Sequence, residues 1–300
     1  MSSAEKFRAS IFQSLSIGRR SPSLGMVIIL AVLMSAIQGL SLATTVWTTG
    51  YFGDTDDALR MVQVRDFLAG QAWYDLNVHR LNPPDGLLIH WSRIVDIPLV
   101  VLVRFAEIFF PPQQAELLAR LLFPLFLLTA LFLAVARTAR ILLGESAVIP
   151  AIVLCVFTGP IFQQFQPGRV DHHSPQIVLL LFMLCMMLEA MRPGRAFCAA
   201  IAAGLAAISL GISVENLPFI IVMSALLPLF WVFEPRSMRR PLLAFGAGLV
   251  VTLPIVFAAT IAPSRWGVPV CDALSAAYAA PALVGAAGCI LLGALKTPAL

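Results

Sequence analysis

The sequence predicts an all-α polytopic membrane protein with about eight transmembrane helices and a long first extracytoplasmic loop that carries amphipathic helices. Composition is the first observation behind this prediction, because 59% of the 300 residues are hydrophobic and only 12% are charged. Soluble domains average about 45–50% apolar and about 25% charged residues. The mean hydropathy of +0.90 points the same way. The lengths of the apolar segments and the alternation of basic loops are the other two observations.

Eight apolar segments are long enough to cross a bilayer, which takes about 17–25 helical residues. The first follows a basic N-terminus, but it is too long for the apolar region of a signal peptide and lacks a small-residue cleavage site, so we expect it to be retained. The segments are 24–46, 116–136, 146–165, 175–191, 196–213, 217–233, 241–261 and 276–295. We therefore expect a cytoplasmic N-terminal segment (1–23) and one transmembrane domain (24–300).

Cations recur in every second gap between these segments, and they predict the orientation. Short loops rich in Lys and Arg stay cytoplasmic. Both termini are therefore expected in the cytoplasm, the chain in a bacterial inner membrane, and the alternate loops in the periplasm. The cations are Lys6, Arg8, Arg19, Arg20, Arg137, Arg140, Arg192, Arg195, Arg236, Arg239, Arg240 and Lys296.

Residues 94–110 could be taken as a further span, but that topology would place Arg137 and Arg140 outside and invert every later loop. The segment also contains Asp96, Pro98 and Glu107, which suit an amphipathic helix at the membrane interface better. The first periplasmic loop then covers residues 47–115, far longer than an ordinary connection, and loops of that length are usually functional.

Two acidic clusters fall on the predicted outer face. Asp56 and Asp57 open the first loop, and Asp171 begins an Asp-His-His run just before the fourth segment. Glu215 lies in the outer link between the fifth and sixth segments. Polar clusters on a lipid-embedded scaffold indicate a functional site. Simpler interpretations stay open: solvated loop acids, and helix caps at Asp171 and Glu215, each of which precedes a proline.

These motifs resemble a known family. Asp56-Asp57-Ala58 followed by Arg65-Asp66-Phe67, and later Gly168-Arg169-Val170-Asp171-His172-His173, are similar to the acidic motifs of the GT-C superfamily of integral membrane glycosyltransferases. Within it the chain resembles oligosaccharyltransferase catalytic subunits and their bacterial relatives, and also protein O-mannosyltransferases and aminoarabinose transferases. The resemblance covers roughly residues 25 to 260. The Trp-Trp-Asp-Tyr-Gly motif that reads N-glycosylation sites is absent from the sequence.

The resemblance implies transfer of a sugar or oligosaccharide from a polyprenyl-phosphate or polyprenyl-pyrophosphate donor to a glycan, lipid or protein acceptor on the periplasmic face. Asp56, Asp57 and Asp171 are then the candidate catalytic carboxylates. Besides membrane lipids, the expected partners include a possible further subunit but no nucleic acid. Candidate ligands of a Mg²⁺ or Mn²⁺ ion are Asp56, Asp171, His173 and Glu215. Candidate contacts to the donor phosphate, for which Arg is well suited, are Arg60, Arg80, His90 and Arg93.

Two other classes of function remain open. A transporter or flippase-like permease would bind its substrate through outer acids, but such proteins place polar residues mid-membrane and often show inverted repeats, which this sequence lacks. A noncatalytic membrane subunit of a glycan-assembly complex is the third possibility. Substitution of the acids separates them, because only an enzyme loses activity while its expression stays normal.

Overall fold

The computed structural model describes residues 23–295 and is helical almost throughout, which confirms the predicted all-α class. The described strands form one short antiparallel ribbon, β1 (Asn77–Val78) with β2 (Leu87–Leu88). The predicted cytoplasmic segment 1–23, apart from its last residue, and Lys296 lie outside the described residues.

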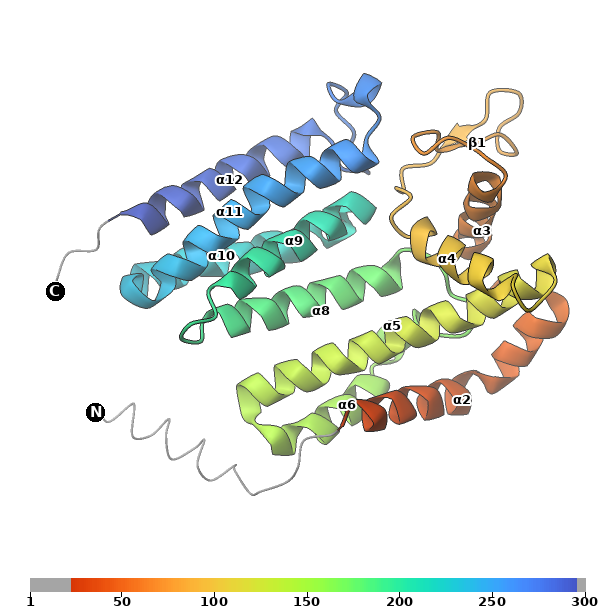
Figure 1. Ribbon diagram of the computed structural model, residues 1–300, viewed down its shortest axis with the longest axis horizontal. Coiled ribbons are helices and arrows are strands. Elements are labelled where there is room, and N and C mark those ends of the chain that lie inside the picture. The colour runs from red at the N-terminus through yellow and green to blue at the C-terminus, as the bar shows by residue number, and fades with distance from the viewer. Residues whose placement is uncertain (1–22, 296–300) are drawn as a thin grey trace.

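Most helices lie side by side along the long axis of the molecule, and the chain runs back and forth between its two ends (Figure 1). Residues 50–111 lie between α2 and α5 and are called the outer segment after their predicted position. Their two helices and the ribbon gather at the end of the bundle where α2 finishes and α5 begins, which is called the outer end (Figure 1). The long-axis helices are α2 (Leu24–Thr49), α5 (Pro112–Leu143), α8 (His173–Ala190), α9 (Phe197–Ile212), α10 (Leu217–Phe233), α11 (Pro235–Thr260) and α12 (Ala276–Ala294). The two outer helices are α3 (Thr55–Leu68) and α4 (Asp96–Ala106).

Six of the described helices are long and apolar enough to cross a membrane. They are Gly25–Thr49, Pro112–Leu143, His173–Ala190, Val214–Phe233, Pro235–Thr260 and Ala276–Ala294. Two more apolar helices, Glu145–Val156 and Phe197–Ile212, are shorter. The predicted count of eight is therefore not confirmed.

The prediction of one continuous helix over 146–165 is wrong. The structure divides it into a 3₁₀ turn (Glu145–Ala147), α6 (Val148–Val156) and α7 (Gly159–Gln163). The break lies at Phe157-Thr158, just before Gly159-Pro160, because proline lacks the amide hydrogen that a helix continuing from α6 would need but is tolerated in the first turn of a new helix. Hydropathy stays high across this break, so the apolar run hid it.

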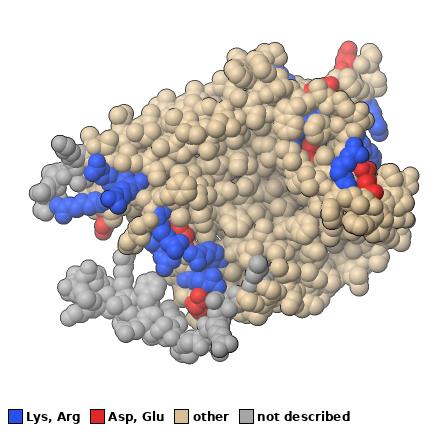
Figure 2. Space-filling model, in the orientation of Figure 1, with Lys and Arg blue, Asp and Glu red and all other residues tan. Residues whose placement is uncertain are grey.

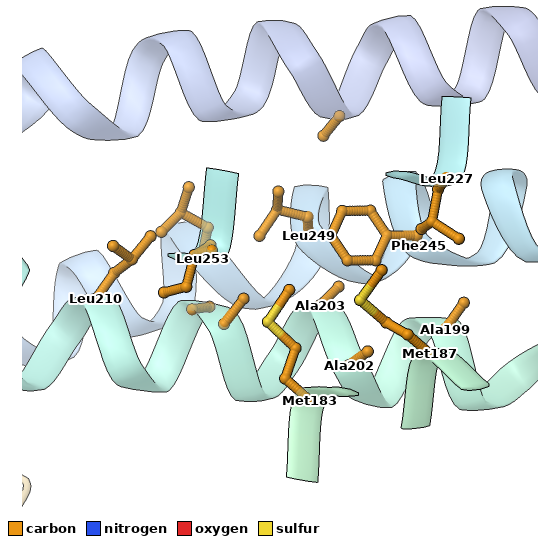
Figure 3. Packing of buried hydrophobic residues seen from close by; sticks show 14 of the residues in the cluster. Met183, Met187, Ala199, Ala202, Ala203, Leu210, Leu227, Phe245, Leu249 and Leu253 are labelled. Carbon is orange, nitrogen blue, oxygen red and sulfur yellow. The ribbon is translucent and has the colours of Figure 1, made fainter. Parts of the chain in front are cut away.

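Small side chains pack α9 between its neighbours. Ala199, Ala202 and Ala203 of α9 lie against Phe245 of α11 and the methionines of α8 (Figure 3). The backbones come close enough that a Cβ on Gly248 would lie 2.7 Å from the Cα of Ala200. Small residues allow such close approach between helices in membranes. This packing holds α8, α9 and α11 together, and the polar residues described below lie at the start of α8 and just after the end of α9.

The outer segment is held by a buried ion network. Arg60 of α3 donates to Asp96 Oδ1 at 2.9 Å, and Arg93 donates to Asp96 Oδ2 at 3.1 Å. All three side chains are essentially inaccessible to solvent. Trp73 and Tyr74 then tie the segment to the end of α11 by donating to the carbonyls of Ala259 and Ala258. The outer segment is thus fastened across the end of the bundle.

Arginines gather at the other end of the molecule, as Figure 2 shows. They lie at the end of α5, in the α8–α9 turn and at the start of α11, in agreement with the predicted alternation. α2 begins and α12 ends at this same end (Figure 1). The described arginines there are Arg137, Arg140, Arg192, Arg195, Arg236, Arg239 and Arg240.

Candidate functional site

Asp57 is the centre of the polar cluster at the outer end. It lies in the first turn of α3, which Asp54 caps by accepting a hydrogen bond from the Asp56 amide at 3.1 Å. The Asp57 side chain is fully buried, and its Oδ1 accepts from the backbone amides of Val170 at 2.7 Å and Asp171 at 3.1 Å. The two predicted acidic motifs are therefore in direct contact.

Gly168 allows the second motif to approach. Its φ of +94° is a conformation that side chains with a Cβ rarely adopt, and an added Cβ would lie 2.9 Å from Val46 Cγ2. Glycine is favoured where both restrictions apply. Its amide donates to the carbonyl of Arg120 at 3.1 Å, so α5 also holds the turn. The turn thereby directs two successive amides at Asp57.

The Arg169 guanidinium lies among three carboxylates. Nη1 donates to Asp54 Oδ2 at 2.8 Å and lies 3.1 Å from Asp57 Oδ2. Nη2 donates to Asp171 Oδ2 and also to the Gln164 side chain at 2.8 Å. The contact with Asp57 Oδ2 is an ion pair without hydrogen-bond geometry, since this buried oxygen has no hydrogen-bond partner among the described residues. One cation for three acids leaves the cluster negative when all three are ionised.

The surroundings shift the pKa values of two of these acids in opposite directions. Burial raises the pKa of Asp57 to about 6, and it outweighs the two backbone amides and Arg169, which act to lower it. The hydrogen bond from Arg169 holds the pKa of the more exposed Asp54 below its usual value. A carboxyl group that titrates near neutral pH can exchange a proton with a substrate.

Two histidines and Glu215 extend the cluster toward α8. His172 Nε2 lies 2.9 Å from Glu215 Oε1, and His173 Nδ1 lies 3.1 Å from Glu215 Oε2. Asp171 Oδ1 accepts from the His173 amide at 2.8 Å at the start of α8. The N-cap residue of α8 is His172, one position later, so Asp171 belongs to the acidic cluster and binds an amide at the start of the helix without being its cap residue.

Part of the predicted metal site comes together in space. Asp171, His172 and His173 can each offer a ligand atom, and these atoms lie within 4.8 Å of one another. His172 Nδ1 is buried and has no hydrogen-bond partner among the described residues. Carboxylate and imidazole are donors that suit a divalent transition metal. The half-buried Asp56 is not part of this group, and within residues 23–295 its carboxylate makes no hydrogen bond or ion pair.

The four predicted phosphate contacts do not gather around Asp57. Arg60 and Arg93 are buried against Asp96, as described above. Arg80 is exposed and lies 3.9 Å from Asp66, and His90 lies 3.8 Å from Asp272. Arg60 is linked to the cluster only indirectly, through Trp91. The Arg60 guanidinium lies 4.9 Å from the centroid of the Trp91 ring, and that centroid lies 4.9 Å from the centroid of the His172 ring.

Sequence reasoning missed the central cation. Arg169 lies in the second acidic motif, two residues before Asp171. An arginine so close to an acidic residue could have indicated an ion pair within the site. Asp54 and Gln164, which bind the same guanidinium, were also not predicted. Buried Arg120 was missed as well. It donates to the Gly50 carbonyl at 3.1 Å and stacks on Phe52, and so holds the turn between α2 and α3.

Two cavities adjoin the cluster. A polar cavity of about 260 Å³ is lined by Asp54, Asp57, Arg169 and three glutamines. An apolar cavity of about 490 Å³ lies among α4, α5, α8 and α9 and is lined only by hydrophobic side chains, including Val95 and Pro175. Val95 is next to Asp96 in the chain, and Pro175 comes two residues after His173. Val95 also belongs to the same buried hydrophobic cluster as Val170, whose amide binds Asp57, so the apolar cavity lies near the polar cluster, although the two cavities share no lining residue.

Comparison with models of known protein families and with curated protein sequences gives no match. The fold and the site define a class all the same: a multi-pass α-helical membrane protein with a buried carboxylate cluster at one end of its bundle.

Proposed function

We propose that this protein is an integral membrane glycosyltransferase of the GT-C type, which transfers a sugar from a polyprenyl-phosphate or polyprenyl-pyrophosphate donor to an acceptor on the periplasmic face. The observation that carries the proposal is the presence of two cavities near the cluster, a polar one that Asp57 lines and a separate apolar one beside α8. A lipid-linked sugar has the same two parts, an isoprenoid chain and a phosphate-bound sugar. In this proposal the chain crosses the bacterial inner membrane eight times, with α9 and the α6–α7 segment as the two shorter passes.

Asp57 is the proposed general base. The acceptor oxygen or nitrogen attacks the anomeric carbon, the bond from that carbon to the phosphate oxygen breaks, and the phosphate leaves with the bonding electrons. Asp57 Oδ2, the oxygen without a hydrogen bond, takes the acceptor proton. Oδ1 stays bound to the amides of Val170 and Asp171, which fixes the orientation of the carboxyl group. A positioned base of this kind contributes about 10²–10⁴-fold to a rate.

A divalent cation fits the donor set on the α8 side of the cluster. Asp171, His172 and His173 would hold it, with Glu215 beside them, and a mixture of carboxylate and imidazole suits Mn²⁺ better than Mg²⁺. When bound, such an ion would supply positive charge for the leaving phosphate. Asp56 falls outside this set, and the burial of Arg60 and Arg93 removes them from the proposed donor contacts. Arg80 and His90 remain candidates for contacts to a bound donor.

The proposed base predicts the pH dependence of transfer. The pKa of Asp57 is about 6, so at lower pH its carboxyl group is mostly protonated and cannot accept a proton. The rate of transfer should therefore fall as the pH drops through 6. Arg169 lowers the pKa of Asp57, so Arg169→Gln should raise this pKa and move the acid limb of the profile to higher pH. The measurement is the initial rate from pH 5 to 8 in isolated membranes. Arg104→Gln, which removes an exposed cation paired with Glu107, is the control and should leave the limb in place.

A deletion strain tests the proposed function itself. Mass spectrometry of envelope glycolipids, polysaccharides and glycoproteins should show the loss of one defined sugar. Wild type should restore the sugar, whereas Asp171→Asn, made at equal membrane abundance, should not. The asparagine oxygen can still accept from the His173 amide, so we expect the fold to be kept while the charge is lost. Full restoration by Asp171→Asn would favour a noncatalytic subunit, and a lipid-linked donor that accumulates in the cytoplasmic leaflet of the deletion strain would favour a flippase.

A further inference from the structure

A second charged cavity lies at the end of the molecule opposite α3 and α4. It has a volume of about 770 Å³ and is formed by the turn between α8 and α9 and by the first turns of α11. Its lining includes four arginines and no acidic residue. The arginines are Arg192, Arg236, Arg239 and Arg240. Figure 2 shows the arginines gathered at this end.

The acids nearest to this cavity in the chain, Glu189 and Glu234, are fewer than its four arginines. The buried carboxylate of Glu189 is shared by three arginines: it pairs with Arg137, with Arg195 at 3.2 Å and with Arg192 at 3.5 Å. Arg240 has no ion pair or hydrogen bond within residues 23–295. The cavity is therefore strongly positive, and an anion in it would relieve repulsion among its own arginines.

One of the cavity arginines is already oriented. Arg239 Nε donates to the carbonyl of Gly293 near the end of α12 at 2.9 Å. α11 and α12 are in close contact there, since a Cβ on Gly293 would lie 2.6 Å from Leu243 Cγ. An anchored guanidinium loses less freedom when it binds a phosphate with its remaining nitrogens.

The cavity also has an apolar side, next to the ends of two candidate membrane spans. It lies where two candidate membrane spans meet this end, at the last residue of α8 and the first turns of α11. Phe197, which lines it, is 74% exposed, and neighbouring Met191 is 43% exposed. Arginines around a space of about 770 Å³, beside exposed apolar side chains, match an amphiphile better than a small free anion.

We propose that this cavity binds the phosphate headgroup of an acidic phospholipid, with the acyl chains lying against Phe197. Basic cavities between membrane helices are suited to anionic headgroups, and each arginine near the membrane surface adds attraction. The site would be independent of the sugar-transfer chemistry at the other end. A test of lipid binding is therefore separate from a test of the proposed function.

Native mass spectrometry of the purified full-length protein tests the proposal with phosphatidylglycerol and phosphatidylcholine as probes. We expect phosphatidylglycerol to bind in preference, and Arg240→Gln to weaken it by roughly fivefold, as expected for about 1 kcal/mol per arginine. Arg240→Lys, which keeps the charge, should retain most of the binding. Arg140→Gln is the matched control, because it removes one cation from the same end, where Arg140 pairs with Glu145 outside the cavity.

Three results would overturn the proposal. Equal losses in Arg240→Gln and Arg140→Gln would mean that the end attracts anionic lipid only through its total charge. Equal binding of phosphatidylcholine would remove the role of the headgroup charge. Competition by inorganic phosphate at the same concentration as the lipid would assign the cavity to a free anion.

Discussion

Asp57→Asn should lower the rate of sugar transfer by about 100-fold or more, which is the lower range for loss of a positioned general base. The amide side chain has nearly the same shape and can still accept from Val170 and Asp171, but it cannot take a proton. Its neighbour Asp56 provides the control: Asp56→Asn should leave the rate within about threefold, because the carboxylate is only half-buried and makes no contact with the cluster. The measurement is transfer in isolated membranes, which carry the native donor and acceptor, at matched amounts of each variant.

Opposite results would identify a different base. If Asp56→Asn abolished transfer and Asp57→Asn did not, the base would be Asp56. Asp57 would then serve only to hold the turn at Val170 and Asp171. Full activity in both variants would exclude Asp56 and Asp57 as the proton acceptor.

Asp96→Ala should destabilise the outer segment by about 3–5 kcal/mol, the cost of leaving buried charges without their partner. Asp96 is the shared anion of Arg60 and Arg93, and all three side chains are buried, so its removal strands two guanidinium groups. Glu107→Gln is the control, since Glu107 pairs with Arg104, whose side chain is 58% exposed. Loss of such an exposed pair costs less than about 1 kcal/mol.

Limited proteolysis and thermal unfolding in detergent measure this effect. Asp96→Ala should make residues 50–111 sensitive to protease at temperatures where the wild type and Glu107→Gln resist it. An Asp96→Ala protein as resistant as the wild type would show that the network does not hold the segment, and would return Arg60 and Arg93 to the candidates for phosphate binding.

Much of the helical framework was predictable because lipid imposes simple rules on sequence. A helix satisfies its own backbone hydrogen bonds, so an apolar run of sufficient length becomes a helix in the membrane. The segment predicted at 217–233 coincides with α10, and α8 begins two residues before the predicted start. The prediction of one helix over 146–165 was wrong because a hydropathy value takes no account of the hydrogen bond that Pro160 cannot donate.

The candidate site was predictable only in part. The alternation of basic loops predicted that Asp57, Asp171 and Glu215 lie at the same end of the protein. The structure places all three in one connected cluster. Which of two adjacent aspartates enters the cluster could not be read from the chain, because successive residues on a helix point about 100° apart and either could face inward. The sequence also did not determine which group Arg60 and Arg93 bind, since an arginine suits a phosphate and a buried carboxylate equally well.

Hydropathy and charge, which are local properties of the chain, were sufficient to predict a helical membrane protein with two acidic motifs at one end and arginine-rich turns at the other. The identity of the buried carboxylate, the position of Arg169 among three acids and the pairing of Asp96 with two arginines depend on contacts between residues far apart in the chain. Arg169 and Asp54 are 115 positions apart, yet they are hydrogen-bonded. Such pairs form only when the helices pack, because packing decides which charges lose water and must be neutralised by one another.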